Sequence, residues 1–249
     1  MLRIPVVFNA SNLASALCGV VCGAAAVLVT QRVARSRRAA IEAPAAWSGD
    51  NPGFHIEKAE EQMYKRFLQV QSRVVLYPDG RKADFDIVGH PRGEYKFTVV
   101  FVFHSSDRTV TLLREFAQAA LPHAALVYGL VCGGYDPRKH ISLKHAAECE
   151  LSEEARLEGG KWTALLPGND HPGVLESKWC RNRFTPFLCV DPAPAATPGS
   201  RDAEEYLSVM RVPVEQLKAL LLGGQMLTPS LTTCVLALAR LERGLIDFD

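Results

Sequence analysis

The clearest hydrophobic pattern in the chain is a series of short apolar runs separated by turn residues. Phe97 to His104 is an almost continuous β-branched and aromatic run, and Thr109 to Arg114 is predicted to be its hairpin partner. A run without polar alternation is typical of a strand covered on both faces. Further strands are predicted at Ala124 to Val131, Phe184 to Val190 and Tyr206 to Val212. The pattern therefore predicts a sheet that is packed on both sides.

Apolar residues at helical spacing supply the layers that cover this sheet. They predict three helices, at Leu143 to Leu157, Val214 to Leu222 and Leu231 to Leu241. The first helix follows Cys132-Gly133-Gly134-Tyr135-Asp136-Pro137, which is predicted to be a glycine-marked turn. Strands interleaved with helices in this way predict a mixed α/β domain with helices on both faces of the sheet.

The region before these strands combines a predicted helix with a predicted hairpin. Ile56 to Val70 is a charged stretch that we predict to be helical. Arg73 to Tyr77 and Lys82 to Val88 flank the turn Pro78-Asp79-Gly80, where proline presets φ and glycine tolerates positive φ. We expect the domain to begin near residue 51, with residues 51–95 as its N-terminal strands and helix.

The first 50 residues have a different composition. No acidic residue occurs from Met1 to Ile41, and Leu13 to Thr30 is an uncharged apolar run followed by arginines. Such an arm suits either an organelle presequence, for a mitochondrion or chloroplast, or a single-pass membrane anchor with the domain in the cytosol or matrix. Ala43 to Pro52 has linker composition. We predict an arm plus linker over residues 1–50 and a folded domain over residues 51–249.

Charge and cysteine content narrow the classes of function. The formal net charge is +1, so the chain has no overall field that would attract nucleic acid or a membrane surface. The seven cysteines form no Cys-x-x-Cys pair, which argues against a zinc site or a disulfide framework and favours free thiols. Any charged ligand must therefore be held by a local site.

The predicted helix at 143–157 carries such a site. Glu150 and Glu154 fall within its apolar stripe and Glu153 lies on the border of the stripe. Like charges one helical turn apart repel, and their burial is costly unless a cation compensates. Hard oxygen ligands suit Mg²⁺ or Mn²⁺, and the backbone carbonyl of Cys132 can add a ligand because Gly133 permits close approach. The alternative is an acidic, solvated helix face.

Several segments together resemble a known family. Gly133-Gly134 followed by the segment Ala146 to Leu157 resembles the Nudix box, G-x5-E-x7-R-E-U-x-E-E-x-G-U. Val110 to Gln118 and Asp202 to Leu222 resemble the ADP-ribose and ADP-sugar pyrophosphatase branch, and the resemblance covers roughly residues 65 to 242. It implies a Nudix fold, an α/β/α sandwich with a mixed β-sheet and the Nudix loop-helix-loop.

This chain departs from the family pattern at defined positions. Cys149 stands where the box has an arginine that orients the carboxylates, and Arg156 stands at the terminal glycine. The spacing from Gly134 to Glu150 is one residue longer than in the family. The departures favour a catalytically weak or inactive module, whereas the three retained glutamates favour an enzyme.

The resemblance also implies roles for individual residues. Glu150 and Glu154 should ligate the metal, with Glu153 assisting, and the general base should come from an acidic loop, where Glu204 and Glu205 are preferred over Asp202. Candidate residues for substrate binding are Arg114, Gly133, Gly134 and Arg181.

The implied function is metal-dependent cleavage of the diphosphate in a nucleoside diphosphate linked to another moiety, of ADP-ribose or ADP-sugar type. The alternative function is a module that binds a nucleotide or an RNA 5′ end, or a subunit of a complex. The resemblance further implies a homodimer, in which the strand pair within Arg73 to Val88 exchanges between protomers. Contact with a membrane is expected only through the N-terminal arm, if that arm is not cleaved.

Overall fold

The strand β5, Lys96–His104, lies at the centre of a mixed sheet in the computed structural model. It pairs in parallel with β12, Cys180–Val190, and antiparallel with β6, Thr109–Phe116. The structure describes residues 51–168 and 170–243, so the predictions for the N-terminal arm lie outside it. Within these ranges no helix is both long and apolar enough to span a bilayer.

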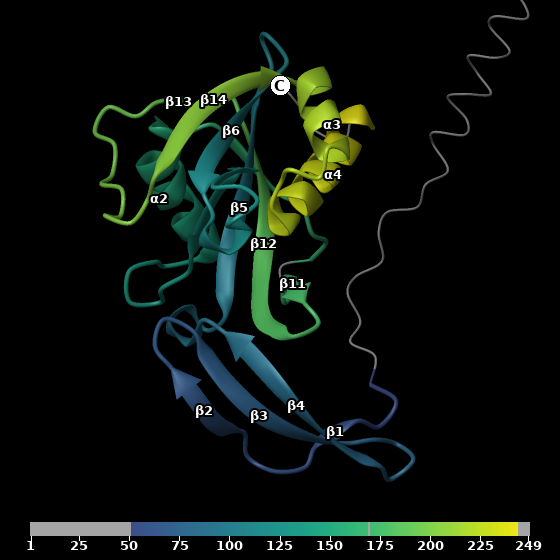
Figure 1. Ribbon diagram of the computed structural model, residues 1–249. Coiled ribbons are helices and arrows are strands. Elements are labelled where there is room, and N and C mark those ends of the chain that lie inside the picture. Colours follow the sequence, from purple (N-terminus) through teal and green to yellow (C-terminus); the bar gives the residue numbers. More distant parts are fainter. Residues whose placement is uncertain (1–50, 169, 244–249) are drawn as a thin grey trace, which may run out of the picture. The chain divides into compact units, whose positions relative to one another are not determined.

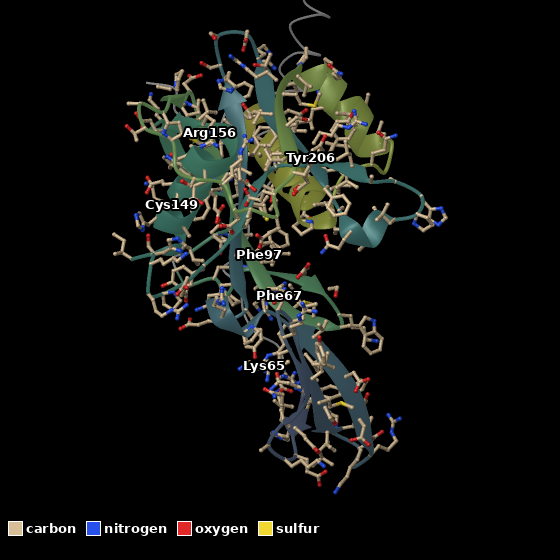
Figure 2. All side chains as sticks on the ribbon, turned by 60° about the vertical axis from the view of Figure 1, so that its left-hand side comes forward. Lys65, Phe67, Phe97, Cys149, Arg156 and Tyr206 are labelled. Carbon is tan, nitrogen blue, oxygen red and sulfur yellow. The ribbon has the colours of Figure 1, made fainter. Side chains whose placement is uncertain are left out.

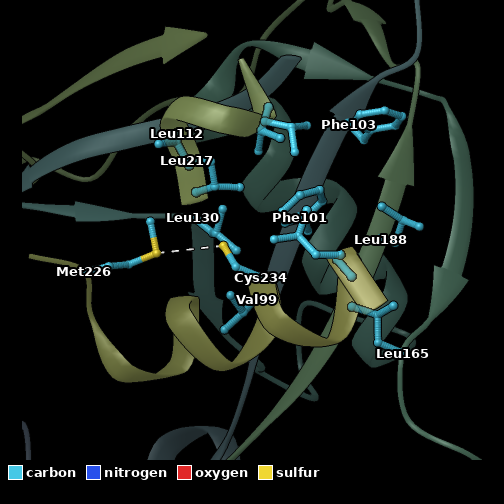
Figure 3. Packing of buried hydrophobic residues seen from close by; sticks show 14 of the residues in the cluster. Val99, Phe101, Phe103, Leu112, Leu130, Leu165, Leu188, Leu217, Met226 and Cys234 are labelled. Atoms are coloured by element: carbon cyan, nitrogen blue, oxygen red, sulfur yellow. Dashed lines mark hydrogen bonds between the residues drawn. The ribbon is translucent and has the colours of Figure 1, made fainter. Parts of the chain in front are cut away.

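Side chains of β5 alternate between two hydrophobic clusters. Val99 and Phe101 belong to one cluster, and Val100 and Val102 belong to the other. All four are fully buried, because each face of the strand is covered. Figure 3 shows the first cluster, in which Phe101 packs among aliphatic side chains. The continuous apolar run in the sequence is therefore explained by burial on both faces of the sheet.

Helices cover the two faces of this sheet. The helix α2, Leu143–Ala155, lies on one face, and α3, Val214–Leu222, and α4, Thr228–Glu242, lie on the other (Figure 1). The predicted α/β/α sandwich with a mixed sheet is confirmed. The remaining elements of this part are β7 (Leu126–Gly129), β8 (Val131–Gly134), β9 (Leu157–Glu158), β10 (Lys161–Ala164), β11 (Val174–Ser177), β13 (Ala193–Pro194), β14 (Leu207–Pro213) and the 3₁₀ turns η1 (Pro91–Gly93) and η2 (Gln118–Ala120).

The prediction of one strand from Ala124 to Val131 was wrong. The chain changes partner at Leu130, so that β7 pairs with β6 while β8 pairs with β5. Gly133 and Gly134, predicted to form a turn, belong to β8 and pair with Thr98 and Phe97. The loop before α2 begins only after them. A single-sequence pattern does not show this change, because no polar or charged turn residue separates the two short strands.

The predicted helix at Ile56 to Val70 was also wrong. This segment forms β1, His55–Ile56, β2, Glu61–Lys65, and the start of β3, Gln69–Leu76. Helical propensity is a weak preference that pairing with another strand overrides. The predicted hairpin is confirmed, with β3 paired to β4, Lys82–Gly89, across the turn at Pro78.

The strand β2 forms an open edge within the described ranges. It pairs with β3 alone, and all five of its residues are exposed. Met63 and, in the loop that follows, Phe67 are 61% and 74% exposed. An edge strand with unpaired backbone groups is a common site of association between chains. The homodimer stays a prediction, and this edge is a surface that can support it.

Candidate active site

The helix α2 is held over β8 by defined contacts at its N-terminus. Ser142 is the N-cap, and its hydroxyl accepts a hydrogen bond from the backbone N–H of His145 at 3.0 Å. In the preceding loop, Asp136 accepts hydrogen bonds from the backbone and guanidinium of Arg138. This pairing lowers the pKa of Asp136, so the loop is fixed by a charged side chain rather than by a glycine turn.

Glu150 lies directly on the backbone of Gly133. A Cβ atom added to Gly133 would overlap the Glu150 carboxylate, whereas one added to Gly134 would meet no atom within 4 Å. Only a glycine at position 133 therefore leaves room for this carboxylate. The sequence analysis expected Gly133 to permit close approach for a backbone metal ligand, which stays a prediction; the structure shows that the Glu150 carboxylate occupies this space.

Glu154 lies one helical turn further on and is 4% exposed. Its carboxylate accepts a hydrogen bond from the backbone N–H of Cys132 at 2.8 Å. The two carboxylates therefore face β8 from the apolar side of α2, beside the buried Ala147 and Leu151. The predicted placement of Glu150 and Glu154 within the apolar stripe is what the structure has.

The C-terminus of α2 explains one departure from the family pattern. Arg156 is the C-cap and has φ +61°, a left-handed conformation that favours glycine. Its guanidinium donates to the carbonyl of Gly199 in the loop before β14. Arg156 therefore adopts a strained backbone conformation, and its side chain links α2 to that loop. Figure 2 labels Arg156 and Cys149 at this helix.

The loop before β14 carries further acidic residues, among them Glu205. Arg201 donates to the backbone carbonyls of Glu153, at 3.3 Å, and Glu154, at 2.6 Å. Gly199 N–H donates to the Ser152 hydroxyl at 3.1 Å. These bonds anchor the loop to the acidic turn of α2 and bring Glu205 to the same place. One oxygen of Glu205, Oε2, is buried without a hydrogen-bond partner in the described part of the chain.

The carboxylates raise one another's pKa. Burial first, and then the charge of Glu153, raises the pKa of Glu150 to about 8. Burial also raises the pKa of Glu154 to about 9. The hydrogen bond from Cys132 lowers this pKa, and the charge of Glu150 raises it further. Burial and Asp202 raise the pKa of Glu205. Lys139 near Glu150 and Arg201 near Glu205 act in the opposite direction, but burial and the repulsion between carboxylates outweigh them.

A cavity of about 590 Å³ opens beside these carboxylates. Its lining includes Gly133, Gly134 and the acidic residues Asp136, Glu150, Glu153, Glu176 and Asp202. It also includes basic and aromatic side chains, namely those of His90, Arg92, Tyr95, Lys96, Phe97, Tyr135, Arg138, Lys139 and His140. Of these, Arg92 and Lys139 make no ion pair with any described residue. The cavity thus offers acceptors for a cation next to donors for an anion.

Three predicted site residues lie elsewhere. Arg114 is exposed on β6, with its guanidinium 5.7 Å from the centre of the Tyr128 ring. Arg181 forms an ion pair with Glu60 at 2.7 Å and faces a second hollow of the surface. Glu204 is exposed and does not line the cavity. Their roles stay predictions, and the residues that line the cavity are better placed to contact a substrate.

Two residues that the sequence pattern did not single out belong to the cluster. Arg201 anchors the acidic loop, as described above. Glu115 on β6 is partly buried, and burial together with the charge of Glu205 raises its pKa. The signal for Glu115 was present, because alternate residues of a strand share a face and Leu113 faces α2.

The donor set suits a hard divalent cation. Carboxylate oxygens are the ligands that Mg²⁺ and Mn²⁺ prefer, and the buried Glu205 oxygen lacks any donor. In the described part of the chain, no three acidic, histidine or cysteine side chains are close enough to hold an ion directly as they stand. Mg²⁺ commonly keeps several of its waters, so contacts through water fit this spacing.

Comparisons with known proteins agree with this architecture. The structure is similar to the crystal structure of an ADP compounds hydrolase, with a TM-score of 0.59 and 20% identity over 78% of this chain and 97% of that chain. The NUDIX domain of Shewanella oneidensis NrtR, complexed with ADP ribose, has a TM-score of 0.42 and 16% identity over 66% of this chain and 93% of that chain. MutT, from a study of Aliivibrio salmonicida and Vibrio cholerae, has a TM-score of 0.35 and 14% identity over 50% of this chain and 83% of that chain. No family model and no curated protein matches the sequence. The first of these similarities establishes the fold, which is the predicted Nudix fold.

Replacement of Gly133 tests the geometry of the site. Gly133→Ala is expected to push the Glu150 carboxylate off β8, because the added Cβ would overlap it. A melting experiment with and without Mg²⁺ should show that the variant loses the cation-dependent rise in melting temperature. Gly134→Ala is the matched control, since its Cβ meets open space and should leave that rise intact. Equal behaviour of the two variants would contradict the placement of Glu150.

Proposed function

We propose that this chain is a Nudix-type hydrolase that uses a divalent cation to cleave the diphosphate of an ADP-linked compound. The observation that carries the proposal is the pair of buried carboxylates, Glu150 and Glu154, turned toward the glycine strand β8. Burying two such groups one helical turn apart is unfavourable unless a cation lies among them. The cavity beside them is lined by both acidic and basic residues, as a site for a metal-bound diphosphate requires.

The cation-binding residues follow from this arrangement. Glu150 and Glu154 would hold Mg²⁺ or Mn²⁺, with Glu153 on the cavity side and the Cys132 carbonyl as a further candidate ligand. Such a cation polarises a phosphoryl oxygen and lowers the pKa of a bound water. Arg201 would act as a positioning residue, because it fixes the backbone of the two neighbouring glutamates.

Basic residues that line the cavity would bind the diphosphate. Arg92 and Lys139 have no carboxylate partner among the described residues, so their charges remain available for phosphate oxygens. Tyr95, Phe97 and Tyr135 offer aromatic surface for a nucleobase. The adenine nucleotide is chosen because the hydrolase that shares this fold acts on ADP compounds.

The reaction would be attack of water on a phosphorus atom of the diphosphate. The new bond joins the water oxygen to phosphorus, and the bond from that phosphorus to the bridging oxygen breaks. ADP-ribose would thus yield AMP and ribose 5-phosphate. Glu205 is better placed than Glu204 to take the proton, because its carboxylate lies at the cluster, whereas Glu204 is exposed.

The decisive experiment measures release of AMP from ADP-ribose by the full chain. We expect turnover in Mg²⁺, loss of turnover in a chelator, and recovery when Mg²⁺ is restored. Glu148→Gln is a suitable control, because Glu148 pairs with Lys144 on the outer side of α2 and should not affect the rate. No turnover across a panel of nucleoside diphosphate compounds would overturn the hydrolase.

A non-catalytic role is the second candidate, and Cys149 favours it. This half-buried residue occupies the arginine position of the box, and its sulfur lies 3.8 Å from His145 Nε2 rather than at a carboxylate. A chain that binds ADP-ribose, as measured by a rise in melting temperature, without hydrolysing it would support a nucleotide-binding module instead. The same assay therefore distinguishes the two candidates.

A further inference from the structure

Glu115 lies on the same side of the sheet as the carboxylates of α2. Leu113, two residues earlier on β6, packs in the cluster that contains Ala147 and Leu151 of α2. Because side chains two residues apart share a face of a strand, Glu115 also points to the α2 side. Arg114 between them lies on the opposite face, against Tyr128. An acidic side chain therefore follows the buried Leu113 on this face of β6.

The neighbouring strand makes room for this carboxylate. Gly129 lies on β7 beside β6, and a Cβ atom added to it would overlap the Glu115 oxygen Oε1. This repeats the arrangement on β8, where Gly133 makes room for Glu150. Two glycines on two short strands thus each admit one carboxylate into the same cluster.

Glu205 approaches Glu115 from the other neighbouring strand. Phe116 N–H donates to the Tyr206 carbonyl at 2.9 Å, and Glu115 is the pairing partner of Leu207 on β14. The residue before Tyr206 is Glu205, whose oxygen Oε2 is buried without a partner. Glu115 itself accepts no hydrogen bond and forms no ion pair within the described residues. Within the described residues, neither the Glu115 carboxylate nor the Oε2 oxygen of Glu205 thus has a hydrogen-bond partner.

We propose that Glu115 belongs to the cation centre, where its carboxylate acts with Glu154 and Glu205 to bind the divalent ion, in part through the waters that the ion retains. The inference rests on the proposed function, which places the ion at Glu150 and Glu154. It adds a ligand from the central sheet to those from α2 and from the loop before β14. A partly buried acid with neither a hydrogen bond nor an ion pair among the described residues is explained if a cation is its partner.

The test is calorimetric titration of the metal-free full chain with Mn²⁺, in the wild type and in Glu115→Gln. Glutamine keeps the shape and removes the charge. We expect Mn²⁺ affinity to fall at least about tenfold, as is typical when a residue supporting a metal site is lost. In a chelator, the melting temperature of Glu115→Gln should rise, since an uncompensated buried charge has been removed. A merely structural Glu115 would not affect Mn²⁺ affinity.

Controls separate the possible failures. Glu215→Gln removes a carboxylate that is 81% exposed on α3 and should change neither quantity. Unchanged Mn²⁺ affinity in Glu115→Gln, with normal binding by the wild type, would overturn the inference alone. Absence of Mn²⁺ binding in the wild type would overturn the proposed metal centre itself. If Glu115→Gln folds poorly, Glu115→Asp should give intermediate affinity, and full wild-type affinity there would count against direct participation.

Discussion

Glu154→Gln is expected to abolish cation-dependent hydrolysis while making the metal-free protein more stable. The glutamine oxygen can still accept the hydrogen bond from Cys132, so the change removes charge and little else. A bound cation contributes several kcal/mol to stabilising a phosphoryl transition state. Each 1.4 kcal/mol corresponds to a factor of ten in rate, so we expect a loss on the order of 100-fold or more in kcat.

The expected changes in hydrolysis rate and in metal-free stability have opposite signs, and this distinguishes loss of a metal ligand from misfolding. The rate is measured as AMP release in Mg²⁺, and stability is measured as the denaturant midpoint in a chelator. A misfolded variant would lose both, whereas loss of a metal ligand lowers the first and raises the second. Glu148→Gln, on the outer side of the same helix, should leave both near the wild-type values. Full activity in Glu154→Gln would falsify the assignment of this residue to the metal.

The stability of the metal-free protein is expected to fall as pH rises. In the folded state the pKa of Glu150 is about 8 and that of Glu154 about 9, above the ordinary value of 4.5. Between pH 4.5 and the folded-state pKa of each group, the folded state holds a proton that the unfolded state has released. The free energy of unfolding therefore decreases as pH rises through this range. Each fully retained proton contributes about 1.4 kcal/mol per pH unit, which gives an expected loss of several kcal/mol for the two groups.

The cleanest window for this measurement lies between about pH 6.5 and 8. Burial lowers the pKa of His104, so its contribution to stability is lost as pH falls below 6.5 and opposes the effect there. Buried thiols such as Cys132 become relevant only above pH 9. Urea unfolding in a chelator should show the decline, and Mg²⁺ should remove it because the ion keeps the carboxylates charged. A flat profile in the chelator would show that the carboxylates are not buried together.

Much of the fold was accessible from local pattern. Phe97 to His104 has the continuous apolar character of a strand covered on two faces, and β5 is such a strand. The helical period placed Glu150 and Glu154 within an apolar stripe, which is a property of one short segment. Where a neighbouring strand decided the outcome, as for the segment of β1 and β2, local propensity gave the wrong answer.

The sequence by itself determined the acidic helix, the glycines before it and the class of chemistry they suit, because these depend on spacing within a few turns. Only the tertiary structure decided that Arg201 anchors the loop to α2 and that Glu115 faces the same carboxylates. Arg201 lies 47 residues from Glu154, and Glu115 meets Glu205 through pairing of β6 with β14. Such contacts depend on which strands become neighbours, a choice made by burial of the whole sheet rather than by any local period.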